Sequence, residues 1–397
     1  MSSLTRQQSA VLLFSLLTVA IGQSLVFAIL PPLGREVHLS ELQITSIIAV
    51  SALVFGVASP FWGRFSDRVG RKPVILIGLL GYSLGTLVFA SLFQAALMGV
   101  VASGILFYGL VLVSRCGQAV IMSATSPACT AYAADHSPPE KRTKAMAKLG
   151  AANSLGTILG PAVSGALATL GLLAPLFFAG LLTAVAAVVT LVKLPRAPPN
   201  ELTTRSVRKR LRYRDPRVVR FLVAAVGLFT GFSAIQQTLG FSVQDRLLLS
   251  GIETAQMTGA ALMVSAVFAF MAQWLIVQKL NFEPEQFVLG GLVSLLMATF
   301  FIGSFETFGF LSIGMAFMGT GLGLSMPSIS AGASLAVTPE EQGAVAGLVA
   351  SCPAAGFVIG PVAAGWLYQQ DETWASIFSA TVFVLLLFIM LITHKRS

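Results

Sequence analysis

Long apolar stretches recur along the whole chain and are separated by short segments rich in Gly, Pro or charged residues. Each is close to the roughly 20 residues that a helix needs to cross a bilayer. A single span in hydrocarbon must be helical, because lipid offers no hydrogen-bond partner for free backbone groups. The pattern predicts an all-α membrane protein with twelve transmembrane helices, near residues 10–33, 42–62, 74–96, 103–131, 147–170, 175–194, 219–241, 257–278, 287–305, 308–334, 344–368 and 374–393.

Composition agrees with a membrane protein and gives no sign of an enzyme. Hydrophobic residues make up 55% of the chain and charged residues 10%, against roughly 25% charged in a soluble domain. The cysteines Cys116, Cys129 and Cys352 lie in apolar stretches without metal-ligand spacing. There is no phosphate-binding loop and no credible nucleophile–base pair. We therefore expect no catalytic residue, metal or cofactor, and no direct use of ATP.

The distribution of basic residues predicts the orientation of the chain. Positively charged loops remain on the cytoplasmic side of a membrane. With both termini in the cytoplasm, 22 of the 25 Lys and Arg residues lie inside, Arg35 and Arg246 lie outside, and Arg115 falls within a span. We expect a multi-pass protein of a bacterial inner membrane with this orientation.

A strongly basic segment from Arg205 to Arg217 separates the sixth and seventh predicted spans. Such clusters occur in nucleic-acid-binding proteins, but a cytoplasmic loop facing anionic lipid has the same composition. We interpret residues 195–217 as a linker between two halves, 1–194 and 218–397, and expect membrane lipid rather than nucleic acid as its partner.

A short internal repeat supports two related halves. The sequence from Gly156 to Gly165 recurs, offset by 200 residues, from Gly356 to Gly365, and Pro127 recurs as Pro327. Glycine and proline dictate backbone geometry, so the matches fall where structure is most constrained. The repeat predicts two pseudo-symmetric six-helix halves, a recurrent plan of transporters in which the substrate site lies between the halves near the midplane.

The loop between the second and third predicted spans reads G-R-F-S-D-R-V-G-R-K-P. An ordinary positive-inside loop would explain its cations but not its aspartate or its glycine spacing. The loop resembles the cytoplasmic signature of the major facilitator superfamily. This resemblance implies a conformational latch, in which the aspartate faces the start of the eleventh helix. The residues of this predicted latch are Gly63, Asp67, Arg68, Gly70, Arg71 and Lys72.

Two further motifs extend the resemblance to nearly the whole chain. In the fourth span, Arg115 and Gln118 resemble the embedded R-x-x-Q-G element of that superfamily, with alanine in place of the final glycine. An arginine inside a span is a functional candidate, because its burial is costly. The repeated segment, from Gly156 to Gly165 and again from Gly356 to Gly365, resembles the antiporter signature of the drug:proton branch of the superfamily. Its motif residues are Gly156, Gly160, Pro161, Gly165, Gly360 and Pro361. Small residues at ordinary helix contacts would produce the same pattern.

The charges inside the spans predict the substrate class. None of the 16 acidic residues falls inside a predicted span, which leaves Arg115 as the embedded charge. A dry cavity with one guanidinium favours anions over cations. We therefore expect a neutral or anionic substrate, such as a carboxylate metabolite, a siderophore or a drug-like compound. The candidate substrate-binding residues, each of which could equally pack helices, are Arg115, Gln23, Phe27, Gln118, Asn153, Phe232, Gln236 and Gln237.

These observations favour a monomeric secondary exporter that works by alternating access. Protons are the expected coupling ion, although no span holds a histidine or carboxylate at its middle, so the coupling residue stays open. Two alternatives remain: an uptake symporter for a nutrient or metal chelate, and a membrane sensor that transports nothing.

Overall fold

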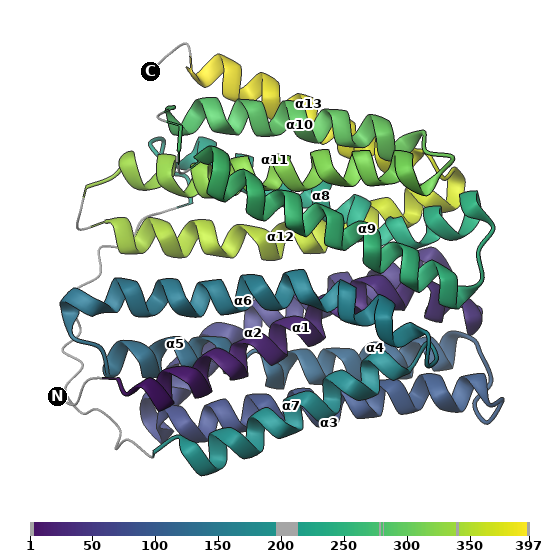
Figure 1. Ribbon diagram of the computed structural model, residues 1–397, viewed down its shortest axis with the longest axis horizontal. Helices are drawn as coiled ribbons and strands as arrows, with labels where there is room; N and C mark the ends of the chain where they lie inside the picture. The colour runs from purple at the N-terminus through teal and green to yellow at the C-terminus, as the bar shows by residue number, and fades with distance from the viewer. Residues whose placement is uncertain (1–3, 196–212, 278, 281, 339–340, 395–397) are drawn as a thin grey trace. The chain divides into compact units, whose positions relative to one another are not determined.

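The computed structural model describes residues 4–195, 213–277, 279–280, 282–338 and 341–394, and in this part of the chain every regular element is a helix (Figure 1). The prediction of an all-α protein is confirmed. The elements are α1 (Arg6–Glu36), α2 (Glu41–Val69), α3 (Arg71–Leu97), α4 (Ile105–Met122), α5 (Thr125–Asp135), α6 (Pro139–Ala168), α7 (Ala174–Lys193), α8 (Val219–Leu247), α9 (Gly251–Met271), η1 (Ala272–Val277), α10 (Pro284–Gly303), α11 (Phe308–Leu335), α12 (Gln342–Gln370) and α13 (Trp374–His394).

Eleven helical segments of the described residues are long and apolar enough to cross a membrane. They correspond to eleven of the twelve predicted spans. The remaining one, predicted at 147–170, lies in α6, which is 30 residues long. Because α6 begins with a polar turn and is rich in Gly, Ala, Ser and Thr, it is less apolar than the others.

The fourth predicted span is broken into α4 and α5. At the break, the Ser123 N–H donates to the Ala119 carbonyl at 3.2 Å, but the Ala124 N–H turns to the Ile121 carbonyl at 3.1 Å. Pro127 lies four residues after Ser123, and a proline ring clashes with the carbonyl four residues before it. This proline accounts for the interruption. The eighth predicted span also departs from a regular α-helix, since α9 ends in the π-helical turn η1.

The chain divides into two compact units, which are described separately. Unit 1 comprises Met1–Ser40, Val50–Thr203 and Ser250–Gly259, and unit 2 comprises Glu41–Ala49, Thr204–Leu249 and Ala260–Ser397. The predicted linker 195–217 falls mostly on residues 196–212, outside the described part of the chain.

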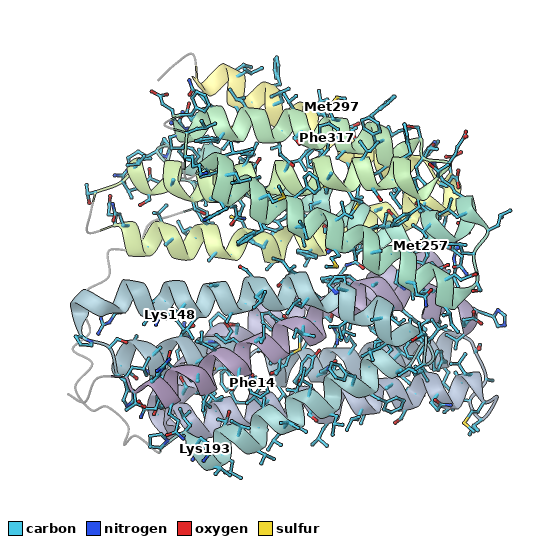
Figure 2. The ribbon with its side chains drawn as sticks, viewed as in Figure 1. Phe14, Lys148, Lys193, Met257, Met297 and Phe317 are labelled. Atoms are coloured by element: carbon cyan, nitrogen blue, oxygen red, sulfur yellow. The ribbon has the colours of Figure 1, made fainter. Side chains whose placement is uncertain are left out.

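Each unit has an apolar interior and apolar outer faces. In unit 1, Phe14 on α1 packs against a buried cluster that includes Leu12, Leu79 and Tyr132 (Figure 2). In unit 2, Phe317 on α11 stacks on Phe301 of α10, with ring centroids 5.7 Å apart. An exposed apolar stripe along one face, as expected next to lipid, is formed on α3 by Ile77, Leu80, Leu84 and Val88.

Candidate functional site

Arg115 lies inside unit 1, on α4, with 5% of its surface exposed. Its Nη1 donates to Gln118 Oε1 at 2.6 Å, one helical turn further along. The guanidinium also lies over the ring of Phe89 on α3, 5.7 Å from the centroid. Its Nε–H has no hydrogen-bond partner. A buried charge-bearing donor without a partner is costly, which makes this atom a candidate for binding an acceptor.

Gln118 is fixed in turn by α3. Its Nε2 donates to Thr86 Oγ1 at 2.6 Å and to the Tyr82 carbonyl at 3.2 Å. The close approach of α4 to α3 requires a glycine, since a Cβ at Gly85 would lie 2.6 Å from Cγ of Gln118. The direction of the Arg115 side chain is therefore fixed by its hydrogen bond to Gln118, which is itself anchored on the backbone of α3.

The same part of unit 1 includes the first helix. Gln23 on α1 is half-buried, and its Nε2 lies 3.8 Å from the Met122 sulfur on α4. The ring of Tyr82 fits against Gly22, where a Cβ would overlap the phenol oxygen, and that hydroxyl has no partner. Arg115 and Gln118 thus form a polar group held by α3, and Gln23 of α1 contacts the same helix, α4, at Met122.

The remaining substrate-binding candidates of unit 1 are less closely connected to this group. Phe27 lies one turn after Gln23 on α1 and is half-buried. Asn153 on α6 is exposed, and no hydrogen bond among the described residues joins its side chain to Arg115 or Gln118. Both stay predicted substrate-binding residues.

In unit 2, the three predicted residues lie together on α8. Gln236 and Gln237 are 7% and 2% exposed. Gln236 Oε1 and Gln237 Nε2 have no hydrogen-bond partner. Phe232 lies one turn earlier and packs edge-to-face with Phe357 of α12, with centroids 6.3 Å apart. Unpaired buried amide groups are costly, so α8 also presents polar atoms that a ligand or water could satisfy.

The described acidic residues lie near the ends of helices or between them. Every described Asp or Glu lies within three residues of a helix end or between helices. Asp245, near the end of α8, accepts a hydrogen bond from the Tyr368 hydroxyl at 2.7 Å. The described residues contain no group of three His, Cys, Asp or Glu side chains able to hold a metal.

The charged segment predicted as a loop is helical except at Gly70: it forms the end of α2 and the start of α3, and it is organised around Arg71. This side chain pairs with Asp67 at 2.5 Å and with Asp135, at the end of α5, at 2.9 Å. Its Nη1 also donates to Ser66 Oγ at 2.7 Å. Gly70, with φ of 94°, forms the turn into α3, a backbone conformation that favours glycine.

The other predicted latch residues surround this pairing. Lys72 donates to the Leu191 carbonyl on α7 at 2.8 Å. Arg68 is exposed, and a Cβ at Gly63 would meet Pro127 at a relaxed 3.9 Å. Sequence reasoning identified Asp67 but missed two partners of Arg71: Asp135, which lies outside this segment at the end of α5, and Ser66, which lies within it but carries no charge.

Unit 2 contains ion pairs that sequence reasoning also missed. Arg217, just before α8, pairs with Asp215 at 2.7 Å and with Glu341 at 2.9 Å. Arg220 pairs with Glu285, at the start of α10, at 2.7 Å. The hydrogen bonds from Arg217 lower the pKa of the Asp215 carboxyl below its ordinary value. The loop signature is absent from unit 2, yet an arginine between two carboxylates occurs in both units.

The glycine–proline motif places helices in very close contact, in the same way in both units. In unit 1, a Cβ at Gly156 would lie 2.6 Å from Cβ of Ala20 on α1, and Ser24 Oγ donates to the Gly156 carbonyl at 3.2 Å. In unit 2, Ser233 Oγ on α8 donates to the Gly356 carbonyl at 3.0 Å. The repeat seen in the sequence is therefore also a repeat of a helix contact.

The remaining motif residues follow the same packing. A Cβ at Gly160 would overlap Ser24, and one at Gly360 would overlap Ser233. Gly165 lies close to α9 within unit 1, since a Cβ added at Gly165 would lie 3.2 Å from the Gln256 carbonyl oxygen. Pro161 and Pro361 each lie inside a helix, where they remove one backbone hydrogen bond.

The sequence matches the Major Facilitator Superfamily over residues 12–352 and 281–396, and the chain belongs to this family. It is 27% identical to Multidrug resistance protein 2 of Bacillus subtilis (strain 168), over 98% of this chain and 95% of that protein. It is also 27% identical to the class B Tetracycline resistance protein of Escherichia coli, over 89% and 86% of the two chains.

Solved structures agree on the fold. The nucleoside transporter NupG superposes with a TM-score of 0.78 at 13% identity, over 98% of this chain and all of that one. Because the chain belongs to the Major Facilitator Superfamily and is similar to the two resistance proteins, it is a multi-pass membrane transporter of small molecules and not an enzyme.

Proposed function

We propose that this chain exports a small organic molecule from the cytoplasm of a bacterium in exchange for protons, by alternating access between its two halves. The observation that carries the proposal is its similarity, over nearly the full length, to a protein named for multidrug resistance. The tetracycline resistance relative supports the same direction of transport. Both termini lie in the cytoplasm in this proposal, and the monomer is the working unit.

The substrate is neutral or anionic. Arg115 is buried in unit 1 with an unpartnered Nε–H, and the described acidic residues all lie near helix ends. A guanidinium with free hydrogen-bonding capacity in a low-dielectric setting attracts carboxylates and repels cations. Gln118 acts by orienting Arg115, and Gln23 with Gln236 and Gln237 of α8 supply neutral polar contacts.

The loop that begins at Gly63 acts as the conformational latch. Arg71 is held by Asp67 and Asp135, so the loop carries a preformed charge arrangement. Loss of the pairing between Arg71 and Asp67 would release it. The glycine–proline helices α6 and α12 provide close, rigid helix contacts on which such a motion depends.

The direction of transport is tested in everted and right-side-out membrane vesicles with an imposed proton gradient. A panel of antibiotics and dyes of anionic, neutral and cationic character serves as substrate. We expect proton-driven accumulation in everted vesicles. Accumulation confined to right-side-out vesicles would show an importer, and the absence of proton-dependent flux in both would show a different coupling or no transport.

The charge preference is tested with Arg115→Gln and Arg115→Lys in the same assay. We expect Arg115→Gln to abolish flux of anionic substrates while that of neutral ones is largely retained. Arg115→Lys should be intermediate, because lysine keeps the charge but loses the planar fork. Undiminished export of carboxylates by Arg115→Gln would refute the anionic preference and leave the direction of transport unaffected.

A further inference from the structure

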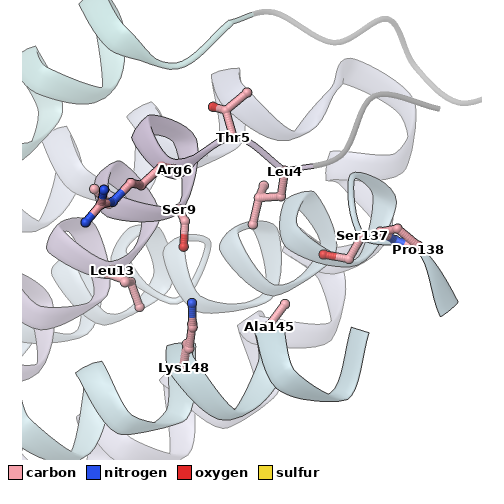
Figure 3. Close-up of a pocket in the computed structure, with 10 residues that line it drawn as sticks. Leu4, Thr5, Arg6, Ser9, Leu13, Ser137, Pro138, Ala145 and Lys148 are labelled. Atoms are coloured by element: carbon pink, nitrogen blue, oxygen red, sulfur yellow. The ribbon is translucent and has the colours of Figure 1, made fainter. Parts of the chain in front are cut away.

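A cavity of about 780 Å³ opens in unit 1, at the end where the chain begins (Figure 3). Three segments line it: the start of α1, the connection between α5 and α6, and the first turns of α6. The polar and charged lining residues are Thr5, Arg6, Ser9, Ser137 and Lys148. Neither the motifs nor the polar group around Arg115 account for this cavity.

The cavity follows from how α1 and α6 pack. The two helices touch at Gly156 and Gly160, where an added Cβ would meet the α1 backbone. Lys148 lies two turns of α6 before Gly156, which corresponds to about 12 Å along the helix axis. There the glycines are replaced by larger side chains, and the helices enclose a wedge-shaped space. In Figure 3 the side chain of Lys148 points across this space toward Ser9 of α1.

The wedge is positively charged and rich in donors. Arg6 and Lys148 are exposed. Among the described residues, no carboxylate lines the cavity and neither of these two cations forms an ion pair. Three hydroxyl groups, from Thr5, Ser9 and Ser137, complete the polar lining. The positive charge of the cavity comes from these side chains and not from the N-terminus of α1, because the Gln8 N–H there already donates to Thr5 Oγ1 at 3.2 Å.

We infer that the wedge between α1 and α6 binds a phosphate ester. Two cations and three hydroxyls from separate segments suit a group with several strong acceptor oxygens. The cavity is far larger than a carboxylate, and Leu4, Ala10 and Leu13 line it as well, so it has room for the carbon side of an ester. A phospholipid headgroup and a soluble organic phosphate share this chemistry. The inference does not depend on whether the chain is an exporter.

The inference is tested by thermal unfolding of the purified full chain in a neutral detergent, at constant ionic strength set with sodium chloride. One arm titrates glycerol 3-phosphate, with glycerol as its uncharged counterpart. The other titrates short-chain phosphatidylglycerol, with a short-chain lipid carrying a neutral sugar headgroup as its counterpart. A ligand that binds only the folded state raises the midpoint in proportion to the logarithm of its concentration.

We expect at least one phosphate ester to raise the midpoint, and both neutral counterparts to leave it unchanged. Stabilisation by glycerol 3-phosphate identifies a soluble ligand, and stabilisation by phosphatidylglycerol alone identifies a lipid headgroup. Lys148→Gln and Arg6→Gln should each weaken binding by on the order of tenfold, as expected for loss of one charge-assisted hydrogen bond. Lys148→Arg should retain binding.

Arg142→Gln is the matched control, because Arg142 is an exposed cation of the same helix that does not line the cavity. It should bind like the wild type. Equal binding by Lys148→Gln and Arg142→Gln would refute the site, since any ligand effect would then be a general response to charge. No stabilisation by either phosphate ester would refute it as well.

Discussion

Replacing Gly160 by alanine tests the close contact between α1 and α6. The added Cβ would lie 2.6 Å from the Ile21 carbonyl oxygen and 2.9 Å from the Leu25 nitrogen, and it would overlap the Ser24 hydroxyl. Two of these three atoms belong to the α1 backbone, so a rotamer change cannot relieve the overlap. The helices must move apart, and the Ser24 hydrogen bond to the Gly156 carbonyl, 3.2 Å long, is weakened at the same time.

The size of the effect follows from two opposing contributions. A separation of 0.5–1 Å forfeits roughly a quarter to a half of the dispersion energy at a contact, and overpacking typically costs about 1–3 kcal/mol. Against this, alanine is better than glycine in a helix by roughly 0.5–1 kcal/mol. We therefore expect Gly160→Ala to lower the free energy of unfolding by about 0–2.5 kcal/mol.

Gly150→Ala separates the two contributions. Gly150 lies on the same helix, and a Cβ there would have no atom within 4 Å. Gly150→Ala gains the same helix propensity as Gly160→Ala but creates no steric overlap. The free energies of unfolding of the two variants should therefore differ by the overpacking cost, about 1–3 kcal/mol. The apparent unfolding midpoints in detergent, scanned at one fixed rate, measure the difference. A Gly160→Ala protein as stable as Gly150→Ala would show that the contact at α1 is looser than described.

Unit 2 offers an independent repetition of this comparison. A Cβ at Gly360 would overlap the Thr230 carbonyl and lie 3.1 Å from the Ala234 nitrogen, whereas one at Gly347 on the same helix would meet nothing within 4 Å. We expect Gly360→Ala to be less stable than Gly347→Ala by a similar margin. If only one unit shows the effect, the two helix contacts are not equivalent.

Two further predictions concern the ion pairs at the helix ends. Asp135→Asn leaves Arg71, 12% exposed, with one carboxylate partner instead of two, so we expect a loss of about 0.5–2 kcal/mol, read as a lower unfolding midpoint; an unchanged midpoint would show that Asp67 alone holds this arginine. Because hydrogen bonds from Arg217 lower the pKa of Asp215, the stabilisation is present above the ordinary pKa of the carboxyl and is lost as pH falls through its lowered value. Arg217→Gln should therefore make the midpoint less sensitive to pH in the acid range, and an identical acid profile in the wild type and the variant would contradict the pairing.

The spans, the repeat and the family could be predicted from the sequence because each leaves a local pattern. Apolar length is set by the bilayer, and Gly156 and Gly356 recur because both contacts require a residue without a side chain. The break between α4 and α5 was missed, although Pro127 was noted as part of the repeat. The clash of a proline ring with the carbonyl four residues earlier was the signal that could have located it.

The partners of the functional residues could not be predicted, because they come from distant parts of the chain. Nothing next to Arg115 in the sequence indicates Phe89, and Thr86 as the anchor of Gln118 follows only when α3 and α4 lie side by side. The spacing along α3 indicates part of this arrangement, because Tyr82, Thr86 and Phe89 follow one another at intervals of four and three residues and so lie on one face of the helix. The ion pairs of Arg217 with Asp215 and Glu341 left no recognisable motif in the sequence.

The serine–glycine joints have a mechanical consequence. Where two backbones touch and a serine hydroxyl also bonds across the contact, we expect little relative movement, so α1 with α6, and α8 with α12, should each move together. Any bending within unit 1 is then left to places where helical hydrogen bonding is already interrupted, and the kink after Met122 is one of them. A label on either side of that kink should report movement that a pair of labels across Gly156 and Ala20 would never record.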